Sequence, residues 1–252
     1  MKSEIKLPFG LKDGRLYHIT EVNNGLKCKC ICPNCGVKLI AKNNPSNKVT
    51  LHFAHHKSSE CPGSLETAIH LMAKQVIKDK LLIYTPKYSK PTRIFDENGQ
   101  YHTGKSTHIR PKKLELDRVE LEVTKKGYRP DVIAIKNDRV LNIEIKVTHD
   151  VDEEKASLVK SLQEPMLEID LSDLIEETLL NKEQFEWEVT HNVNNKKWIN
   201  NPKGELAYKR HLAELKAKVA ETNEKARLKK RKQQEREEYL KNLKVDGKAS
   251  RI

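Results

Sequence analysis

Residues 129–148 read RPDVIAIKNDRVLNIEIKVT, and this stretch decides the fold class. Val132–Ile135 is a short apolar run, and Val140–Thr148 alternates apolar with polar side chains, so both are predicted strands. Residues 136–139 (KNDR) join the two strands and are of the types that favour a tight turn. The stretch therefore predicts a β-hairpin whose second strand carries a Glu-x-Lys pair.

Helices and strands are predicted on both sides of this hairpin. Upstream, apolar residues recur at near-helical spacing over 65–82, with Ser64 as the expected N-cap. Segment 84–112 has no clear period and is expected to form loop or short irregular strands. The remaining expected elements are strand 114–123, helix 152–162, strand 166–171, helix 172–180 and strand 185–190. Strands interleaved with helices indicate an α/β fold with a mixed sheet flanked by helices.

The chain is basic, with 252 residues, a net charge of +12 and 33% charged side chains. This charge favours an anionic partner, with nucleic acid first and an acidic membrane surface second. No apolar run resembles a signal peptide or reaches the roughly 18 residues of a membrane span, so we expect a cytoplasmic protein without a membrane partner.

The C-terminal segment differs in composition from the rest. Residues 203–252 hold 16 Lys or Arg and 8 Asp or Glu, which predicts a long, solvated, basic helix. Such a helix can bind phosphates non-specifically, pair with a protein partner or a second copy, or have no specific role. Its apolar stripe is short (Ala207, Leu212, Leu215 and Val219), which argues against an extended coiled coil.

All five cysteines lie in the first quarter of the chain, where they predict a zinc site. Cys32 and Cys35 are separated by two residues, so both thiolates can reach one tetrahedral ion. His55 and Cys61 are the preferred second pair, with His52 as the substitute for His55. Cys28 and Cys30 are either alternative ligands or buried small residues. A filled four-ligand site would be structural.

Glu144 and Lys146 lie two apart on a predicted strand and therefore share one face. Asp131, at the start of the partner strand, is expected to meet Glu144 across the pair. Two adjacent carboxylates repel one another unless a cation lies between them, and oxygen ligands suit Mg²⁺ or Mn²⁺. Such an ion can activate water against a phosphodiester, with Lys146 orienting the water.

The predicted helix 65–82 carries a second polar group. Glu66, in its first turn, is a candidate third carboxylate. His70 and Lys74 follow one and two turns later on the same face and are candidates for phosphate contact. An ordinary solvated helix face would show the same spacing.

Several stretches together resemble the competence protein CoiA-like nuclease family, a branch of the PD-(D/E)XK superfamily. They are residues 25–36 (GLKCKCICPNCG), 52–55 (HFAH), 66–70 (ETAIH), 129–131 (RPD), 144–149 (EIKVTH) and 168–172 (EIDLS). The resemblance covers roughly residues 8–200 and leaves the basic tail outside.

The resemblance implies a restriction-endonuclease-like core and divalent-metal hydrolysis of phosphodiesters, with DNA as the substrate. Carried over, Glu66, Asp131 and Glu144 are the metal-binding carboxylates, Lys146 is the catalytic lysine, and Lys155 contacts the phosphate backbone. We accordingly expect a zinc-binding module over 1–62, a nuclease domain over 63–200 and a basic helical tail over 201–252. The alternatives are a non-catalytic nucleic-acid-binding protein and a partner-activated subunit of a DNA-uptake or phage-defence assembly.

Overall fold

The computed structural model describes residues 6–44, 46, 50–57, 61–148 and 151–249, with side chains up to residue 242. His149, the last residue of one resembling stretch, lies outside the described residues. The chain divides into two compact units, Met1–Lys87 with Arg110–Pro202 and Tyr88–Ile109 with Lys203–Ile252. The expected domain boundaries at 62 and 200 stay a prediction, and residues 88–109 group with the C-terminal helix.

The first unit begins with two small hairpins. β1 (Phe9–Lys12) pairs with β2 (Arg15–His18), and β3 (Leu39–Lys42) pairs with β4 (His52–His55). Short 3₁₀ turns, η1 (Ile19–Glu21) and η2 (Leu26–Cys28), lie between them along the chain.

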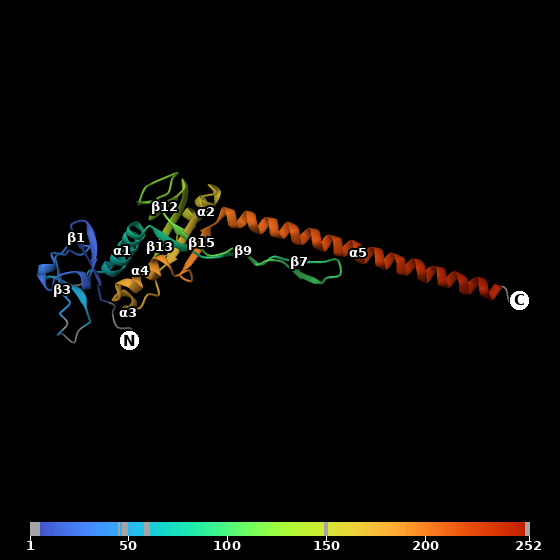
Figure 1. The fold of residues 1–252 in the computed structure, drawn as a ribbon, viewed down its shortest axis with the longest axis horizontal. Coiled ribbons are helices and arrows are strands. Elements are labelled where there is room, and N and C mark those ends of the chain that lie inside the picture. Colours follow the sequence, from blue (N-terminus) through green and yellow to red (C-terminus); the bar gives the residue numbers. More distant parts are fainter. Residues whose placement is uncertain (1–5, 45, 47–49, 58–60, 149–150, 250–252) are drawn as a thin grey trace. The chain divides into compact units, whose positions relative to one another are not determined.

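A five-stranded mixed sheet forms the centre of this unit, as the α/β pattern predicts (Figure 1). Its order is β11 (Arg118–Leu121), β12 (Val132–Lys136), β13 (Arg139–Lys146), β14 (Met166–Asp170) and β15 (Lys196–Asn200). Only β13 and β14 run parallel within this sheet, and α2 (Glu153–Ser161) connects them. β5 (Leu82–Thr85) and β10 (Lys112–Glu115) form a separate antiparallel pair.

Helices cover both faces of the sheet. α1 (Ser64–Lys80) packs on β11 and β13 and also contacts α4 (Lys182–Thr190). α3 (Glu176–Leu179) precedes α4 along the chain. On this face the strands contribute a buried apolar core of Val132, Ala134, Leu141, Ile143, Ile145, Leu167 and Ile169. On the other face, Val159 of α2 packs on Met166 and Tyr128.

The predicted hairpin is confirmed. Lys136 pairs with Arg139, and Asn137 and Asp138 between them both have positive φ, at 47° and 58°. Two such residues suit the two-residue turn that matches the strand twist, and Asn and Asp tolerate that conformation best after glycine.

Four other expectations need correction. Residues 185–190 form part of helix α4 and no strand, since Phe185 and Val189 are buried one turn apart while Trp187 is exposed. The N-cap of α1 is Gly63, with φ of 79°, and Ser64 is the first helical residue. Residues 114–123 form parts of two strands, because the backbone leaves β10 at Leu116. Helix 172–180 shortens to 176–179.

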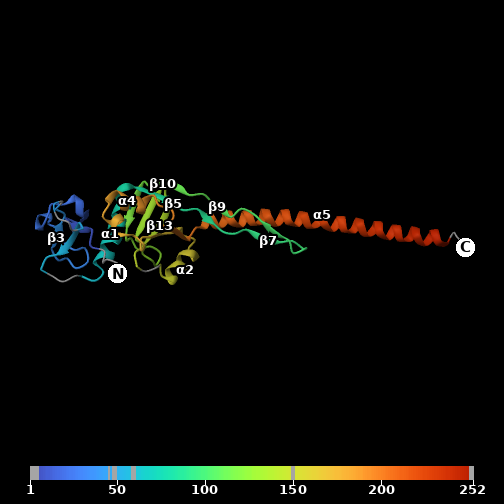
Figure 2. The ribbon, with the colours of Figure 1, turned by 90° about the horizontal axis from the view of Figure 1, so that it is seen from below.

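The second unit is a β-hairpin arm with a long helix. The arm contains β6 (Tyr88–Ser89), β7 (Arg93–Phe95), β8 (Tyr101–Thr103) and β9 (Thr107–Ile109), paired β6–β9 and β7–β8. The predicted C-terminal helix is α5 (Pro202–Ala249). Two views turned by 90° show the arm running beside this helix (Figures 1 and 2). No helix within the described residues is long and apolar enough to cross a membrane.

Candidate metal centre and candidate active site

Four side chains converge in the N-terminal part of the first unit. One ligand atom from each of Cys32, Cys35, His55 and Cys61 lies within 4.8 Å of the others. This is the one group of three or more such ligands found in the described part of the chain, and it is the predicted set. These four residues can hold a metal ion.

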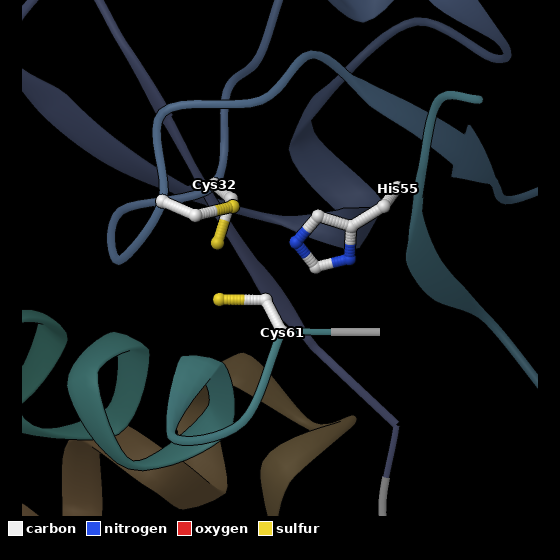
Figure 3. A group of neighbouring side chains, drawn as sticks. Cys32, His55 and Cys61 are labelled. Atoms are coloured by element: carbon white, nitrogen blue, oxygen red, sulfur yellow. The ribbon is translucent and has the colours of Figure 1, made fainter. Parts of the chain in front are cut away.

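Three separate segments bring the four ligands together. Cys32 and Cys35 lie in a turn closed by hydrogen bonds from the Gly36 amide to the Cys32 carbonyl (2.9 Å) and from the Cys32 amide to the Val37 carbonyl (2.8 Å). His55 ends β4, and Cys61 comes just before α1. A ring nitrogen of His55 points toward the sulfurs of Cys32 and Cys61 (Figure 3).

The chemistry of the group suits a soft or borderline cation. The Nε2 atom of His55 is buried and has no hydrogen-bond partner in the described structure, which is costly unless a ligand satisfies it. The backbone amide of Val37 lowers the pKa of Cys35, so this thiol ionises more readily than usual. Three thiolates and one imidazole are the donors of closed tetrahedral sites.

The structure places the alternative ligands outside this group. His52 bonds through Nδ1 to the Thr50 carbonyl at 2.7 Å and lies outside the group. Cys28 and Cys30 are buried, 2% and 1% exposed, and their thiols donate to the carbonyls of Leu39 and Cys28. Burial raises the pKa of Cys30 to about 12, which keeps it a neutral thiol. Both residues are therefore the buried small residues of the second interpretation.

Asp131 lies at the edge of the mixed sheet, immediately before β12. The register pairs Val132 with Ile143, so Asp131 comes next to Glu144 as expected. Its Oδ2 accepts hydrogen bonds from His70 Nε2 and from the Ile145 amide, both at 2.9 Å. Burial is the largest single effect and opposes ionisation, but the interactions with His70, the Ile145 amide and Lys74 together outweigh it and hold the pKa of Asp131 below its usual value. Neither hydrogen bond uses Oδ1.

Glu144 is the most strongly perturbed carboxylate of the pair. It is 8% exposed, its Oε2 accepts from Lys155 Nζ at 2.7 Å, and its Oε1 is buried without a hydrogen-bond partner in the described residues. The pKa of Glu144 is raised to about 7: burial is the main cause, the Lys155 hydrogen bond opposes the shift, and the charge of Asp131 adds to it. The folded chain therefore holds a carboxylate whose ionised form lacks enough positive charge around it.

Lys146 shares the sheet face of Glu144, two residues further on β13. Its Nζ donates to Asp170 Oδ2 at 2.8 Å, and the parallel register places Lys146 beside Asp170 on β14. Ser172 donates to Asp170 Oδ1 through its amide at 3.0 Å and its hydroxyl at 2.5 Å. Asp170 thus orients the lysine and is itself held by the turn that follows β14.

The remaining predicted residues lie around this pair with partners of their own. Glu66 accepts a hydrogen bond from the Thr148 hydroxyl. Lys74 is 3% exposed, forms an ion pair with Glu122 and lies 4.0 Å from Asp131 Oδ1. Glu66, Asp131 and Glu144 do not form a group of three converging ligands among the described residues. The structure thus pairs Asp131 with His70 and Glu144 with Lys155, places Asp131 next to Glu144 in the strand register, and does not bring Glu66 into a ligand group with them among the described residues.

Two acidic residues of this region were missed from the sequence. Asp170 contacts Lys146, and Glu168, fully buried beside Glu144 in the β13–β14 register, forms an ion pair with Lys197 at 2.7 Å. A strand, a short helix and a second strand over 140–170 indicate a parallel crossover, which would have put β14 next to β13. The sequence therefore contains a signal that β13 and β14 are neighbours, but it does not show which residues of the two strands lie side by side.

Comparisons of this chain with protein-family models, with curated proteins and with solved structures find no significant match.

Proposed function

We propose that this protein is a divalent-metal-dependent nuclease of the PD-(D/E)XK type that hydrolyses phosphodiester bonds, with DNA as its substrate. The observation that carries the proposal is the adjacency of Asp131 and Glu144 across the β12–β13 pair, with Lys146 on the same strand as Glu144. The resemblance to CoiA-like nucleases supports the same residues and a restriction-endonuclease-like core.

The donor set fits Mg²⁺ or Mn²⁺. Asp131 and Glu144 offer hard oxygen ligands, and Glu144 Oε1 is a buried acceptor that a cation would satisfy. Glu66 is the third carboxylate of the proposal, and its Thr148 hydrogen bond would have to open for it to join. When bound, the ion polarises the phosphodiester and lowers the pKa of water.

The side chains around the two carboxylates have separate tasks in this proposal. His70 and the Ile145 amide hold Asp131 in place, and Lys155 holds Glu144. Lys146, 18% exposed and oriented by Asp170, orients the attacking water and offsets the negative charge that develops on the phosphate. Lys74 is too deeply buried to contact a phosphate directly in this conformation. Its contribution is therefore to hold Asp131 in place by charge attraction, with Glu122 as its ion-pair partner.

We further propose that the ion held by Cys32, Cys35, His55 and Cys61 is zinc and that its role is structural. Four protein ligands complete a tetrahedral shell and leave no position for a substrate. The site also joins the turn at Cys32, the β3–β4 hairpin and the entry to α1. Through α1 it supports the helix that carries Glu66 and His70.

The test uses circular single-stranded DNA and supercoiled plasmid, incubated with the full-length protein and Mg²⁺, Mn²⁺ or no added metal. We expect metal-dependent cleavage that Asp131→Asn, Glu144→Gln and Lys146→Met each reduce by at least about a hundredfold. Circles have no ends, so their cleavage also identifies an endonuclease. Gel electrophoresis separates the products.

The matched control is Glu214→Gln with Lys216→Met, which removes an exposed Glu-x-Lys pair from α5. This variant should cleave as the wild type does. Cleavage that survives in the Asp131, Glu144 and Lys146 variants would assign the activity elsewhere or to a contaminant.

A second candidate function is a nucleic-acid-binding subunit that a partner activates. It is favoured by the ion pairs that engage the site, Lys146 with Asp170 and Lys155 with Glu144. Under this alternative both DNA circles stay intact with every metal while DNA binding persists in the Glu144→Gln variant.

A further inference from the structure

The tip of the β7–β8 hairpin in the second unit is closed by a hydrogen-bonded turn. Asp96 closes the turn, since its Oδ1 accepts from the amides of Asn98 (2.9 Å) and Gln100 (2.8 Å), and His102 contacts its Oδ2 at 3.0 Å. Gly99 supplies the positive φ, 76°, that this turn needs. The turn at the tip is therefore closed by hydrogen bonds of its own.

Contacts along α5 hold the hairpin arm against the helix. The Nδ1 atoms of His108 and His211 lie 2.8 Å apart. The backbone at Gly104 packs closely on Leu215, since a side chain at Gly104 would place its Cβ only 3.4 Å from the Leu215 side chain. The tip itself is anchored, because Glu97 forms a two-pronged ion pair with Arg227. The apolar stripe predicted on this helix is thus used within the unit, with Leu215 and Val219 9% and 4% exposed.

One face of the hairpin tip presents aromatic rings. Phe95 and Tyr101 are paired across the strands with ring centroids 5.1 Å apart, and Arg93 lies over the Tyr101 ring at 5.6 Å. Phe95 is 69% exposed and Tyr101 44% exposed. Ile94 and His102, which alternate with them, are partly buried on the opposite face. Two exposed aromatic rings at the end of an anchored arm have no role in the core of the unit.

A dense run of positive charge begins on the helix where the tip is anchored. Residues 225–232 read KARLKKRK and are all exposed. Within this run Lys225, Arg227 and Arg231 have acidic partners. Among the described residues, Lys229, Lys230 and Lys232 have none. The aromatic pair and this surplus charge therefore lie at the same part of one unit.

We propose that the hairpin tip and the adjoining basic run form a binding site for single-stranded nucleic acid. Bases stack on Phe95 and Tyr101 while Lys229, Lys230 and Lys232 contact phosphates. Stacking platforms beside a basic track are the chemistry that binds single strands without sequence preference, and base faces are accessible only when unpaired. The choice of nucleic acid as the ligand rests on the proposed function, although the unit contains none of the proposed catalytic residues.

The test measures binding of full-length protein to a fluorescent oligothymidylate and to a duplex of equal length, without added Mg²⁺ or Mn²⁺. Fluorescence anisotropy gives affinities at several salt concentrations, and a gel verifies that the strand stays intact. We expect the single strand to bind more tightly than the duplex. Phe95→Ala with Tyr101→Ala should weaken single-strand binding by about tenfold or more, since each base stacked on an aromatic side chain contributes strongly.

The lysine variant has a different expected result. Affinity falls as salt rises, and each phosphate contact on a single strand contributes about 0.7 to the steepness of log affinity against log salt. Replacing Lys229, Lys230 and Lys232 by glutamine should therefore make this dependence shallower, by about 2 in the slope. The aromatic variant should keep the wild-type slope. Circular dichroism verifies that both variants stay folded.

Two control variants match these changes. Tyr239→Ala removes an exposed aromatic ring from the same helix, and Lys27, Lys78 and Lys87 replaced together by glutamine remove three exposed charges from the first unit. Either control losing as much binding as its counterpart would overturn the site. Wild-type affinity in the aromatic variant, or preference for duplex, would do the same. Cleavage is measured in a separate assay. The binding result therefore tests this site even if the protein proves not to be a nuclease.

Discussion

Glutamine in place of Glu144 removes a carboxylate that the folded chain ionises at a cost. In the folded protein its pKa is about 7, against an ordinary value of 4.5. The native state therefore binds this proton more tightly than the unfolded chain does. Stability accordingly falls as pH rises from about 4.5 to about 7, and the full loss is present above that range.

The size of the effect follows from the two pKa values. Each pKa unit corresponds to about 1.4 kcal/mol, so ionisation of Glu144 lowers the free energy of unfolding by about 3 kcal/mol. The variant does not titrate at this position. Relative to the wild type, Glu144→Gln should gain about 3 kcal/mol in stability between about pH 4 and about pH 8. Lys155 loses its partner in the variant, but it is 21% exposed and can turn to water.

The assay is urea unfolding of both proteins across this pH range without added Mg²⁺ or Mn²⁺, with the midpoint converted to free energy through the slope. Glu120→Gln, which removes a more exposed carboxylate on β11, is the control and should follow the wild type. Parallel stability curves for Glu144→Gln and wild type would refute the reasoning, as would a variant that is less stable only at high pH. A variant that is more stable and yet inactive would separate the proposed role of Glu144 in cleavage from any role in folding.

Two further predictions concern the rest of the first unit. We expect the purified wild type to carry zinc, His55→Ala and Cys61→Ser each to lose it, and His52→Ala to retain it; elemental analysis decides, and zinc retained in His55→Ala would contradict the proposed ligand set. Glu164, although burial opposes its ionisation, is held at a pKa of about 2 by Lys125, Lys126 and Asn142. Its contribution is therefore present above the ordinary pKa and lost as pH falls toward about 2. By the same conversion as for Glu144, Glu164→Gln should be less stable by about 3 kcal/mol at neutral pH and close to wild type at about pH 2. Equal destabilisation in urea at both pH values would contradict this.

Local sequence pattern determined those features of this protein that depend on neighbours along the chain. The apolar spacing of α1, the turn between β12 and β13, and the pairing of Cys32 with Cys35 all lie within short segments. Alternation along β13 likewise determined that Glu144 and Lys146 share a face. In each case the backbone geometry relates residues a few positions apart, so their relation can be read without the fold.

Tertiary structure decided the features that join distant segments. β3–β4 pairing put His55, and not His52, among the cysteines, and the parallel β13–β14 register gave Lys146 its Asp170 partner. Residues 185–190 alternate apolar and polar side chains as a strand would. They nevertheless form part of helix α4, in which Phe185 packs on Phe9 from the start of the chain.

The hairpin arm shows the same division within one element. Residues 96–99 (DENG) carry a local turn signal that the sequence could have supplied, since Gly follows three polar turn residues. That the arm packs on α5, and so buries Leu215 and Val219 and exposes Phe95 and Tyr101, depends on residues more than a hundred positions apart. Burial depends on which surfaces meet in space, and the spacing of residues along one segment carries no information about a surface from another.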